Sequence, residues 1–175
     1  MITELHKSIR NVPDFPKKGI VFRDITTLLK DPKAFSSSID ALYEKYKSER
    51  IDKVVGIESR GFIFGAPLAY KLGCGFVPVR KPKKLPAETL KEEYALEYGT
   101  DTVEVHVDAI TKGERVLLVD DLLATGGTIL AAAKLIERLG GNIISLAFLI
   151  ELSFLNARPR LGSYDIFSLI QYDSE

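Results

Sequence analysis

From residue 53 onward, the hydrophobic positions alternate between short continuous runs and stripes of helical spacing. The continuous runs predict four β-strands, at residues 53–57, 75–80, 115–120 and 143–150. The stripes predict two helices, each followed directly by glycine, at residues 62–72 and 128–139. Because the last two runs are almost wholly apolar, they suit strands covered on both faces, as in a parallel sheet. The pattern therefore predicts an α/β fold, with a central, mainly parallel twisted sheet flanked by helices.

The first 50 residues predict two helices separated by a loop. An apolar stripe between residues 2 and 9 predicts a short helix that ends before Pro13, and residues 13–19 have the composition of a loop. Asp31 followed by Pro32 is typical of a helix N-terminus. The buried stripe of that second helix is expected to be Phe35, Ile39, Leu42 and Tyr46.

One insertion interrupts the alternation of strands and helices. Residues 90–98 are polar with scattered aromatic side chains. Val103, Val105 and Val107 alternate with other residues as in an exposed antiparallel strand. We therefore expect residues 81–108 to form a flap over a site.

Composition narrows the class of protein. The 175 residues are enough for one domain with a hydrophobic core, so we expect a single domain over residues 1–175. The chain holds 24 Lys and Arg against 24 Asp and Glu, which gives no net field for nucleic acid or an anionic membrane. A single cysteine, Cys74, excludes an intrachain disulfide, and no segment is typical of a signal peptide or membrane span. We expect a cytoplasmic protein without nucleic-acid or membrane partners.

The strongest chemical signal lies in residues 116–128. A buried strand runs into Asp120 and Asp121, and a Thr-Gly-Gly-Thr sequence at 125–128 then opens a helix. Ligands of open α/β sheets bind at the carboxyl ends of the strands, where such a loop presents backbone N–H groups to a phosphate. The two carboxylates would repel a phosphate, but they suit sugar hydroxyls or a metal ion. The segment therefore predicts a phosphorylated ribose site; the alternative is a solvated turn followed by an ordinary helix cap.

Several segments match one enzyme family in order along the chain. Residues 119–128, Val-Asp-Asp-Leu-Leu-Ala-Thr-Gly-Gly-Thr, are similar to the ribose-phosphate signature of type I phosphoribosyltransferases. Further matching segments are residues 13–16, 19–24, 58–62, 80–82, 85–86 and 96–99. With them, the chain resembles the adenine phosphoribosyltransferases nearly end to end. The resemblance implies the type I phosphoribosyltransferase fold, with a small N-terminal hood (residues 1–30) and an antiparallel flexible flap. It also implies transfer of the 5-phosphoribosyl group from 5-phosphoribosyl 1-pyrophosphate to adenine, giving AMP and pyrophosphate in purine salvage.

The resemblance also implies where the sugar substrate is held. The phosphoribose is expected against Asp120, Asp121, Ala124, Thr125, Gly126, Gly127 and Thr128. The pyrophosphate is expected against Ser59, Arg60, Lys81 and Lys84. Lys83 replaces a glycine that many family members have, so which lysine reaches the pyrophosphate stays open, with Lys81 preferred over Lys84. Magnesium (Mg²⁺) is the expected cofactor, carried mainly by the substrate.

Catalysis and base recognition follow from the same resemblance. Glu97 and Arg60 are the expected catalytic residues, and Tyr98 belongs to the flap beside Glu97. The adenine site is expected to comprise Val21, Phe22, Arg23 and Leu152. Main-chain N–H and C=O groups would form hydrogen bonds with the edge of adenine. Since a donor and an acceptor cannot exchange roles, a 6-oxopurine would leave these buried groups unpaired. The family resemblance also implies a homodimer.

Two other functions stay open at this point. One is a phosphoribosyltransferase for another purine, such as xanthine. The other is a non-catalytic regulator that binds the sugar phosphate. The balanced charge and the lack of length for an added nucleic-acid-binding domain disfavour the regulator.

Overall fold

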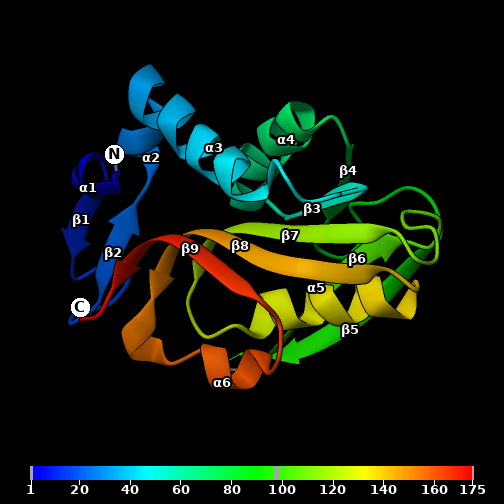
Figure 1. The fold of residues 1–175 in the computed structure, drawn as a ribbon. Coiled ribbons are helices and arrows are strands. Elements are labelled where there is room, and N and C mark those ends of the chain that lie inside the picture. The colour runs from blue at the N-terminus through cyan, green and yellow to red at the C-terminus, as the bar shows by residue number, and fades with distance from the viewer. Residues whose placement is uncertain (1, 97–98, 175) are drawn as a thin grey trace.

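A five-stranded parallel sheet forms the centre of the computed structural model, which describes residues 2–96 and 99–174 (Figure 1). The strand order is β4-β3-β7-β8-β9, and every neighbouring pair is parallel. The strands are β3 (Lys53–Ile57), β4 (Gly75–Val79), β7 (Arg115–Leu123), β8 (Asn142–Leu152) and β9 (Ile166–Tyr172). The predicted α/β fold with a parallel sheet is confirmed.

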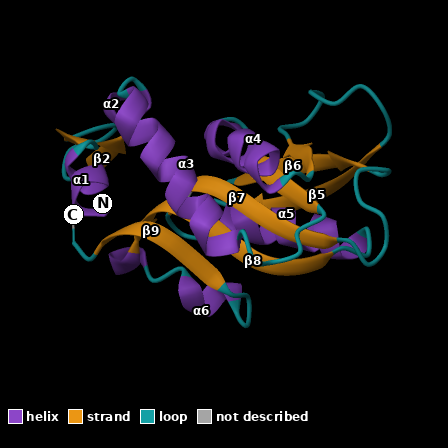
Figure 2. Ribbon diagram, turned by 45° about the horizontal axis from the view of Figure 1, so that its top comes forward, coloured by secondary structure: helices purple, strands orange, loops and turns teal. Residues whose placement is uncertain are grey.

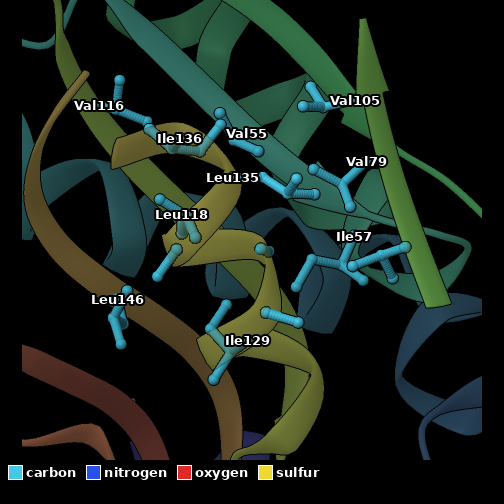
Figure 3. Close-up of a cluster of buried hydrophobic side chains, with 14 of the residues drawn as sticks. Val55, Ile57, Val79, Val105, Val116, Leu118, Ile129, Leu135, Ile136 and Leu146 are labelled. Atoms are coloured by element: carbon cyan, nitrogen blue, oxygen red, sulfur yellow. The ribbon is translucent and has the colours of Figure 1, made fainter. Parts of the chain in front are cut away.

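Both faces of this sheet are covered, as the apolar runs predicted. One face carries α1 (Ile2–Lys7), α2 (Thr26–Leu29), α3 (Pro32–Tyr46) and α4 (Arg60–Leu72). The other carries α5 (Gly127–Arg138) and the hairpin of β5 (Thr89–Ala95) and β6 (Thr100–His106), as Figure 2 shows. Successive side chains of β7 point to opposite faces of the sheet. Leu118 packs under α5, whereas Leu117 and Val119 pack under the N-terminal helices. Figure 3 shows the cluster beneath α5.

The predicted helix ends are mostly confirmed. The Asp31 carboxylate accepts hydrogen bonds from the backbone N–H groups of Lys33 (2.9 Å) and Ala34 (3.2 Å) and so caps α3. Gly73 ends α4 in the left-handed conformation, with φ of 69°. In the stripe of α3, three of the four expected residues are buried, and Phe35 is half-buried.

The structure adds strands that the pattern did not predict. The first helix ends at Lys7, and residues 10–13 form β1 (Arg10–Pro13), which pairs antiparallel with β2 (Val21–Asp24). At the other end, β8 leads through a 3₁₀ turn (Ser153–Leu155) and α6 (Arg158–Leu161) to the edge strand β9. Helix α1 and the C-terminal end of β9 lie beside the β1–β2 pair (Figure 1).

The insertion forms the expected antiparallel hairpin, but the expectation of an exposed strand is wrong. Val103 is 1% and Val105 is 0% exposed, and Val107 is half-buried. These valines are buried because β6 packs against α5 and β4, so its inner face is part of the main core. Within the described part of the chain, no helix has the length and apolar character to cross a membrane.

Candidate active site

The loop after β7 forms the first part of the candidate site. β7 continues three residues beyond the predicted end, so Asp120 and Asp121 belong to the strand and not to the turn after it. α5 begins at Gly127, one residue earlier than predicted. The strand end, the loop and the start of α5 enclose a cavity of ≈ 80 Å³. It is lined by Asp120, Leu122, Leu123, Ala124, Thr125, Gly126, Gly127, Thr128 and Ile129.

Gly126 gives this loop its shape. Its φ of 82° lies in the left-handed region, a backbone conformation that is unfavourable for residues other than glycine. A Cβ at this position would lie 3.4 Å from both Ala157 and Leu161, which pack behind the loop. α6, which carries Leu161, is held by the Arg158 guanidinium, which donates to Glu151 at 2.7 and 2.8 Å. The backbone donors at the start of α5 are therefore supported from behind.

A second cavity, of ≈ 250 Å³, adjoins the first at the carboxyl ends of β3, β4 and β7. It brings together residues that are far apart in the sequence: Ile57, Glu58, Ser59, Arg60, Lys81, Asp120, Asp121, Leu122, Ala124 and Thr128. Four of these residues also line the first cavity, so the two cavities are continuous. Lys84 does not line either of them; its carbonyl accepts from the Arg80 guanidinium at 3.2 Å.

Gly61 lets α4 begin close to the end of β7. A Cβ at this position would lie 2.8 Å from the Val119 carbonyl oxygen and 3.0 Å from Oδ1 of Asp120. Any larger residue would therefore push the N-terminus of α4 away from the strand. Glycine here keeps Arg60, the first residue of α4, next to the two aspartates.

The two aspartates differ in their partners. The Arg60 guanidinium lies 2.9 Å from Oδ2 of Asp121, whose side chain is 4% exposed. Burial raises the pKa of Asp121, although the Arg60 charge opposes the rise. Burial and then the neighbouring Asp121 charge raise the pKa of Asp120 well above its usual value, while its Oδ1 accepts from Asp121 N–H at 2.9 Å. A ligand with hydroxyl donors, or a cation, would relieve the crowding of negative charge at this point.

The far wall of the second cavity is a set of paired charges. Glu58 accepts from Lys81 N–H (2.9 Å) and from the Arg80 guanidinium (3.1 Å). Burial acts to raise the pKa of Glu58, but these hydrogen bonds hold it below the ordinary value. The Lys81 ammonium pairs with Asp101 of β6 and lies 3.0 Å from the hydroxyl of Tyr94 on β5. Tyr94 and Asp101 were not among the site residues predicted from the sequence, because only the packing of the hairpin brings them to Lys81.

The hood meets this site at Phe22. The Arg60 guanidinium carbon lies 5.9 Å from the centre of the Phe22 ring, and the Phe15 ring meets Phe22 edge-on at 5.2 Å. An apolar cavity of ≈ 310 Å³ lies beside Phe22 and is lined by Val12, Phe15, Phe22 and Asp24. Of these, our sequence analysis selected only Phe22 as a base-site residue.

The other three expected adenine residues do not line that cavity. The Arg23 side chain turns toward the C-terminal strand and stacks on Tyr172, with its guanidinium carbon 4.0 Å from the ring centre. Val21 pairs with Pro13 across the hood sheet, and Leu152 pairs with Tyr172 at the end of β8.

Two expected flap residues, Glu97 and Tyr98, lie outside the described residues. Among the residues that are described, no group of three or more His, Cys, Asp or Glu side chains could hold a metal ion unaided. Asp120 and Asp121 are the carboxylates on the cavity that could approach a cation already bound to a phosphorylated ligand.

Comparison with known proteins places this geometry among enzymes. The family model described as a phosphoribosyl transferase domain matches residues 24–173. An adenine phosphoribosyltransferase of Solibacter usitatus is 61% identical over 170 residues, covering 97% of this chain and 98% of the relative. The structure of adenine phosphoribosyltransferase from Thermoanaerobacter pseudethanolicus has a TM-score of 0.95 at 59% identity, covering 98% of this chain and 100% of the other. The Saccharomyces cerevisiae enzyme, complexed with an imino-altritol bisphosphate and adenine, has a TM-score of 0.91 at 44% identity, over 96% and 97% of the two chains.

Proposed function

The chain belongs to the adenine phosphoribosyltransferase family, and on this premise we propose how its residues transfer a 5-phosphoribosyl group from 5-phosphoribosyl 1-pyrophosphate to adenine. The products are AMP and pyrophosphate, in purine salvage. The bond from the anomeric carbon to the pyrophosphate oxygen breaks, and its electron pair leaves with pyrophosphate. Adenine N9 forms the new bond to that carbon, and the proton that N9 carried is released to solvent. The continuous cavity, with an amide-rich loop at one end and cationic side chains at the other, is the observation that supports these roles best.

The sugar substrate lies along that cavity. The 5-phosphate binds residues 124–128, whose backbone N–H groups and hydroxyls are donors at the start of α5. Asp120 and Asp121 accept hydrogen bonds from the ribose hydroxyls. The pyrophosphate binds Ser59, Arg60 and Lys81, and Lys84 is the weaker candidate because it does not line the cavity. Arg60 and Lys81 stabilise the negative charge that grows on the leaving pyrophosphate.

Adenine binds at the hood, next to the reacting carbon. The ring of Phe22 stacks on the base, and main-chain groups of Val21 and Arg23 read its edge. β2 supports this role, because its only strand partner is β1, which leaves one edge of its backbone free of other described strands. Leu152 adds an apolar contact. Glu97 closes toward the base and reacting carbon, and together with Tyr98 keeps water away from the sugar.

Magnesium fits this donor set as an ion that arrives with the sugar diphosphate. Asp120 and Asp121 would hold it from the ribose side, since these adjacent carboxylates have Arg60 as their neighbouring cation, whereas Glu58, the other carboxylate lining the cavity, pairs with Arg80. When bound, the ion neutralises charge on the pyrophosphate oxygens. The residues of the chain then need only to orient the two substrates and exclude water.

A purine panel tests the function. The protein is incubated with magnesium, 5-phosphoribosyl 1-pyrophosphate and adenine, hypoxanthine, guanine or xanthine in turn, and released pyrophosphate is measured. Adenine-dependent release with AMP as product is expected. Release only with xanthine or guanine would reassign the base. No release with any purine would favour a regulator that binds the sugar phosphate without turnover.

We also propose that the protein is a cytoplasmic homodimer, as the resemblance implies. Light scattering on the purified protein would measure the mass against 19.4 kDa for one chain. A mass near that of one chain at assay concentration would refute the dimer.

A further inference from the structure

Two side chains of the β5–β6 hairpin, Tyr94 and Asp101, contact Lys81 of the candidate active site. The three residues are defined here as the Lys81 triad. Tyr94 and Asp101 are directly opposite each other in the β5–β6 pairing, so their side chains lie on the same face of the hairpin. The Tyr94 hydroxyl donates to Asp101 at 3.0 Å and lies 3.0 Å from the Lys81 ammonium, which also pairs with Asp101. Each member therefore contacts the other two.

One member of this triad, Lys81, is part of the wall of the second cavity. Lys81 lines that cavity along with Arg60 and Asp121. An ammonium group has three N–H donors, and Tyr94 and Asp101 accept from two of them. One donor therefore remains for a ligand. A lysine side chain without such partners would lose several rotatable bonds of freedom on binding an anion.

The triad packs against the loop of residues 124–128, which is named the phosphate loop here because it is proposed to hold the 5-phosphate. Tyr94 is 8% exposed and belongs to the main core. A Cβ on Gly127 would lie 3.4 Å from Cδ2 of Tyr94, so the ring packs against the first residue of α5. The same tyrosine thus contacts the loop expected to hold the 5-phosphate and the lysine at the opposite end of the cavity.

We propose that Asp101 and Tyr94 are positioning residues, which fix the Lys81 ammonium at the cavity so that it binds the pyrophosphate group with little loss of side-chain freedom. This inference rests on the proposed function, because it takes Lys81 as a pyrophosphate ligand. It extends that function by making the β5–β6 hairpin a determinant of pyrophosphate affinity through a described, packed contact. Asp101 acts only through Lys81 and does not touch substrate.

Calorimetric titration of the full-length protein with pyrophosphate and magnesium, without adenine, tests the proposal. Asp101→Ala is expected to weaken pyrophosphate binding about tenfold, because Lys81 without its carboxylate partner would lose more side-chain freedom on binding the anion. Asp101→Asn keeps an oxygen acceptor at the same place and is expected to restore most of the affinity. Tyr94→Phe keeps the ring against Gly127, loses only the hydroxyl, and is expected to weaken binding about threefold.

Two further variants separate positioning from a general loss of hairpin structure. Glu92→Gln removes the negative charge through which the same hairpin pairs with Lys134 and Arg138, both at 3.3 Å, away from the second cavity. It is expected to leave pyrophosphate affinity unchanged. In a Lys81→Gln background, Asp101→Ala is expected to have no further effect, since its target is gone.

Several outcomes would overturn the proposal: unchanged affinity in Asp101→Ala, an equal loss in Glu92→Gln, or a full additional loss in the Lys81→Gln background. Failure of the proposed function would instead appear as absent adenine-dependent turnover. Because the titration contains no adenine, the two failures are distinguishable.

Discussion

The two ends of the candidate site are built in different ways. The sugar-phosphate end (residues 120–128) comprises the end of β7, a central strand covered on both faces, and the loop after it, which Ala157 and Leu161 pack from behind. The hood end (residues 10–24) is a two-stranded sheet in which the four residues of β2 are half-buried and Phe15 is 51% exposed.

This difference matches what each end has to recognise. A phosphate and a sugar diol need several donors and acceptors in fixed directions, and a packed strand-loop-helix provides them. A flat base needs a stacking surface and a few edge contacts, which a small sheet can offer. We therefore expect substitutions at the sugar-phosphate end to cost more, and to affect the sugar substrate selectively.

The largest effect is expected from Asp121→Asn. It removes a buried negative charge paired with Arg60 at 2.9 Å, and it replaces one of the acceptor oxygens proposed for the ribose with an amide donor. Losing a hydrogen bond from a charged acceptor costs about 1.5–3 kcal/mol, or about 10- to 150-fold in kcat/KM for the sugar substrate. Steady-state kinetics, with each substrate varied in turn, measure this loss in kcat/KM.

Adenine binding is expected to change little in Asp121→Asn. A matched control is Asp40→Asn. It removes another carboxylate charge that pairs with a cation, here the exposed Asp40–Lys71 pair. An equal loss for adenine and the sugar would contradict the ribose role of Asp121.

Gly61→Ala should have the next largest effect. Its methyl group would meet the Val119 carbonyl oxygen at 2.8 Å, so α4 and Arg60 must move away from β7. Overpacking of this kind costs about 1–3 kcal/mol, and we expect about a tenfold rise in KM for the sugar substrate. Denaturant unfolding measures the loss of stability, and steady-state kinetics on the same sample measure KM for the sugar substrate.

Gly65→Ala is the matched control for that substitution. It lies in the same helix, and the nearest atom to its methyl group would be in the side chain of Phe76, at 3.0 Å, whereas Gly56 Cα and Val54 lie at ordinary contact distances of 3.5 and 3.6 Å. KM for the sugar is expected to stay as in the wild type. If Gly61→Ala behaved like Gly65→Ala, the close approach would have no role in shaping the site.

A smaller effect, at the other end, is expected from Phe22→Leu. Aromatic packing contributes about 0.5–1.5 kcal/mol beyond area, so KM for adenine should rise about three- to tenfold while KM for the sugar is unchanged. Tyr70→Ala, which truncates an aromatic residue that is 88% exposed on α4, is the control. A rise in KM for the sugar substrate alone would contradict the assignment of Phe22 to the adenine site.

The smallest effect concerns how the hood is held. Hydrogen bonds from Thr26 N–H and then from Arg10 lower the pKa of Asp24 from 3.8 to about 2. Because this pKa is lower in the folded state, Asp24 stabilises the fold above about pH 4, and the contribution is lost as the pH falls toward 2. The Arg10 side chain is 57% exposed, so water screens this ion pair and we expect roughly 1 kcal/mol.

Urea unfolding of wild type and Asp24→Asn, near pH 7 and then at stepwise lower pH, measures this contribution. The difference in unfolding free energy should shrink as the pH falls below about 4. A difference that grew on acidification would contradict the assigned direction of the pKa shift.

Local chemistry explains why parts of the molecule were predictable from sequence. The apolar run of β7, the Asp31 cap of α3 and the Gly73 end of α4 each depend on a few neighbouring residues. The loop at 124–128 is of the same kind, since a strand, two glycines and a helix start are contiguous. In contrast, β1 and β2 are four residues each and gain their structure from pairing with each other. Pairing of that kind leaves only a weak periodic signal, although the run of mostly apolar residues in β9 could have indicated a further strand.

The order of residues along the chain thus determined the parallel sheet, the phosphate loop and the candidate residues of the sugar end, because each arises from short-range periodicity or backbone chemistry. Only the tertiary structure decided which of these residues meet. It paired Arg60 with Asp121, buried Val103 and Val105, and joined Lys81 to Tyr94 and Asp101. Such contacts depend on how strands and helices pack over distances of many residues, and packing free energy is spread over the whole core instead of being carried by any single segment.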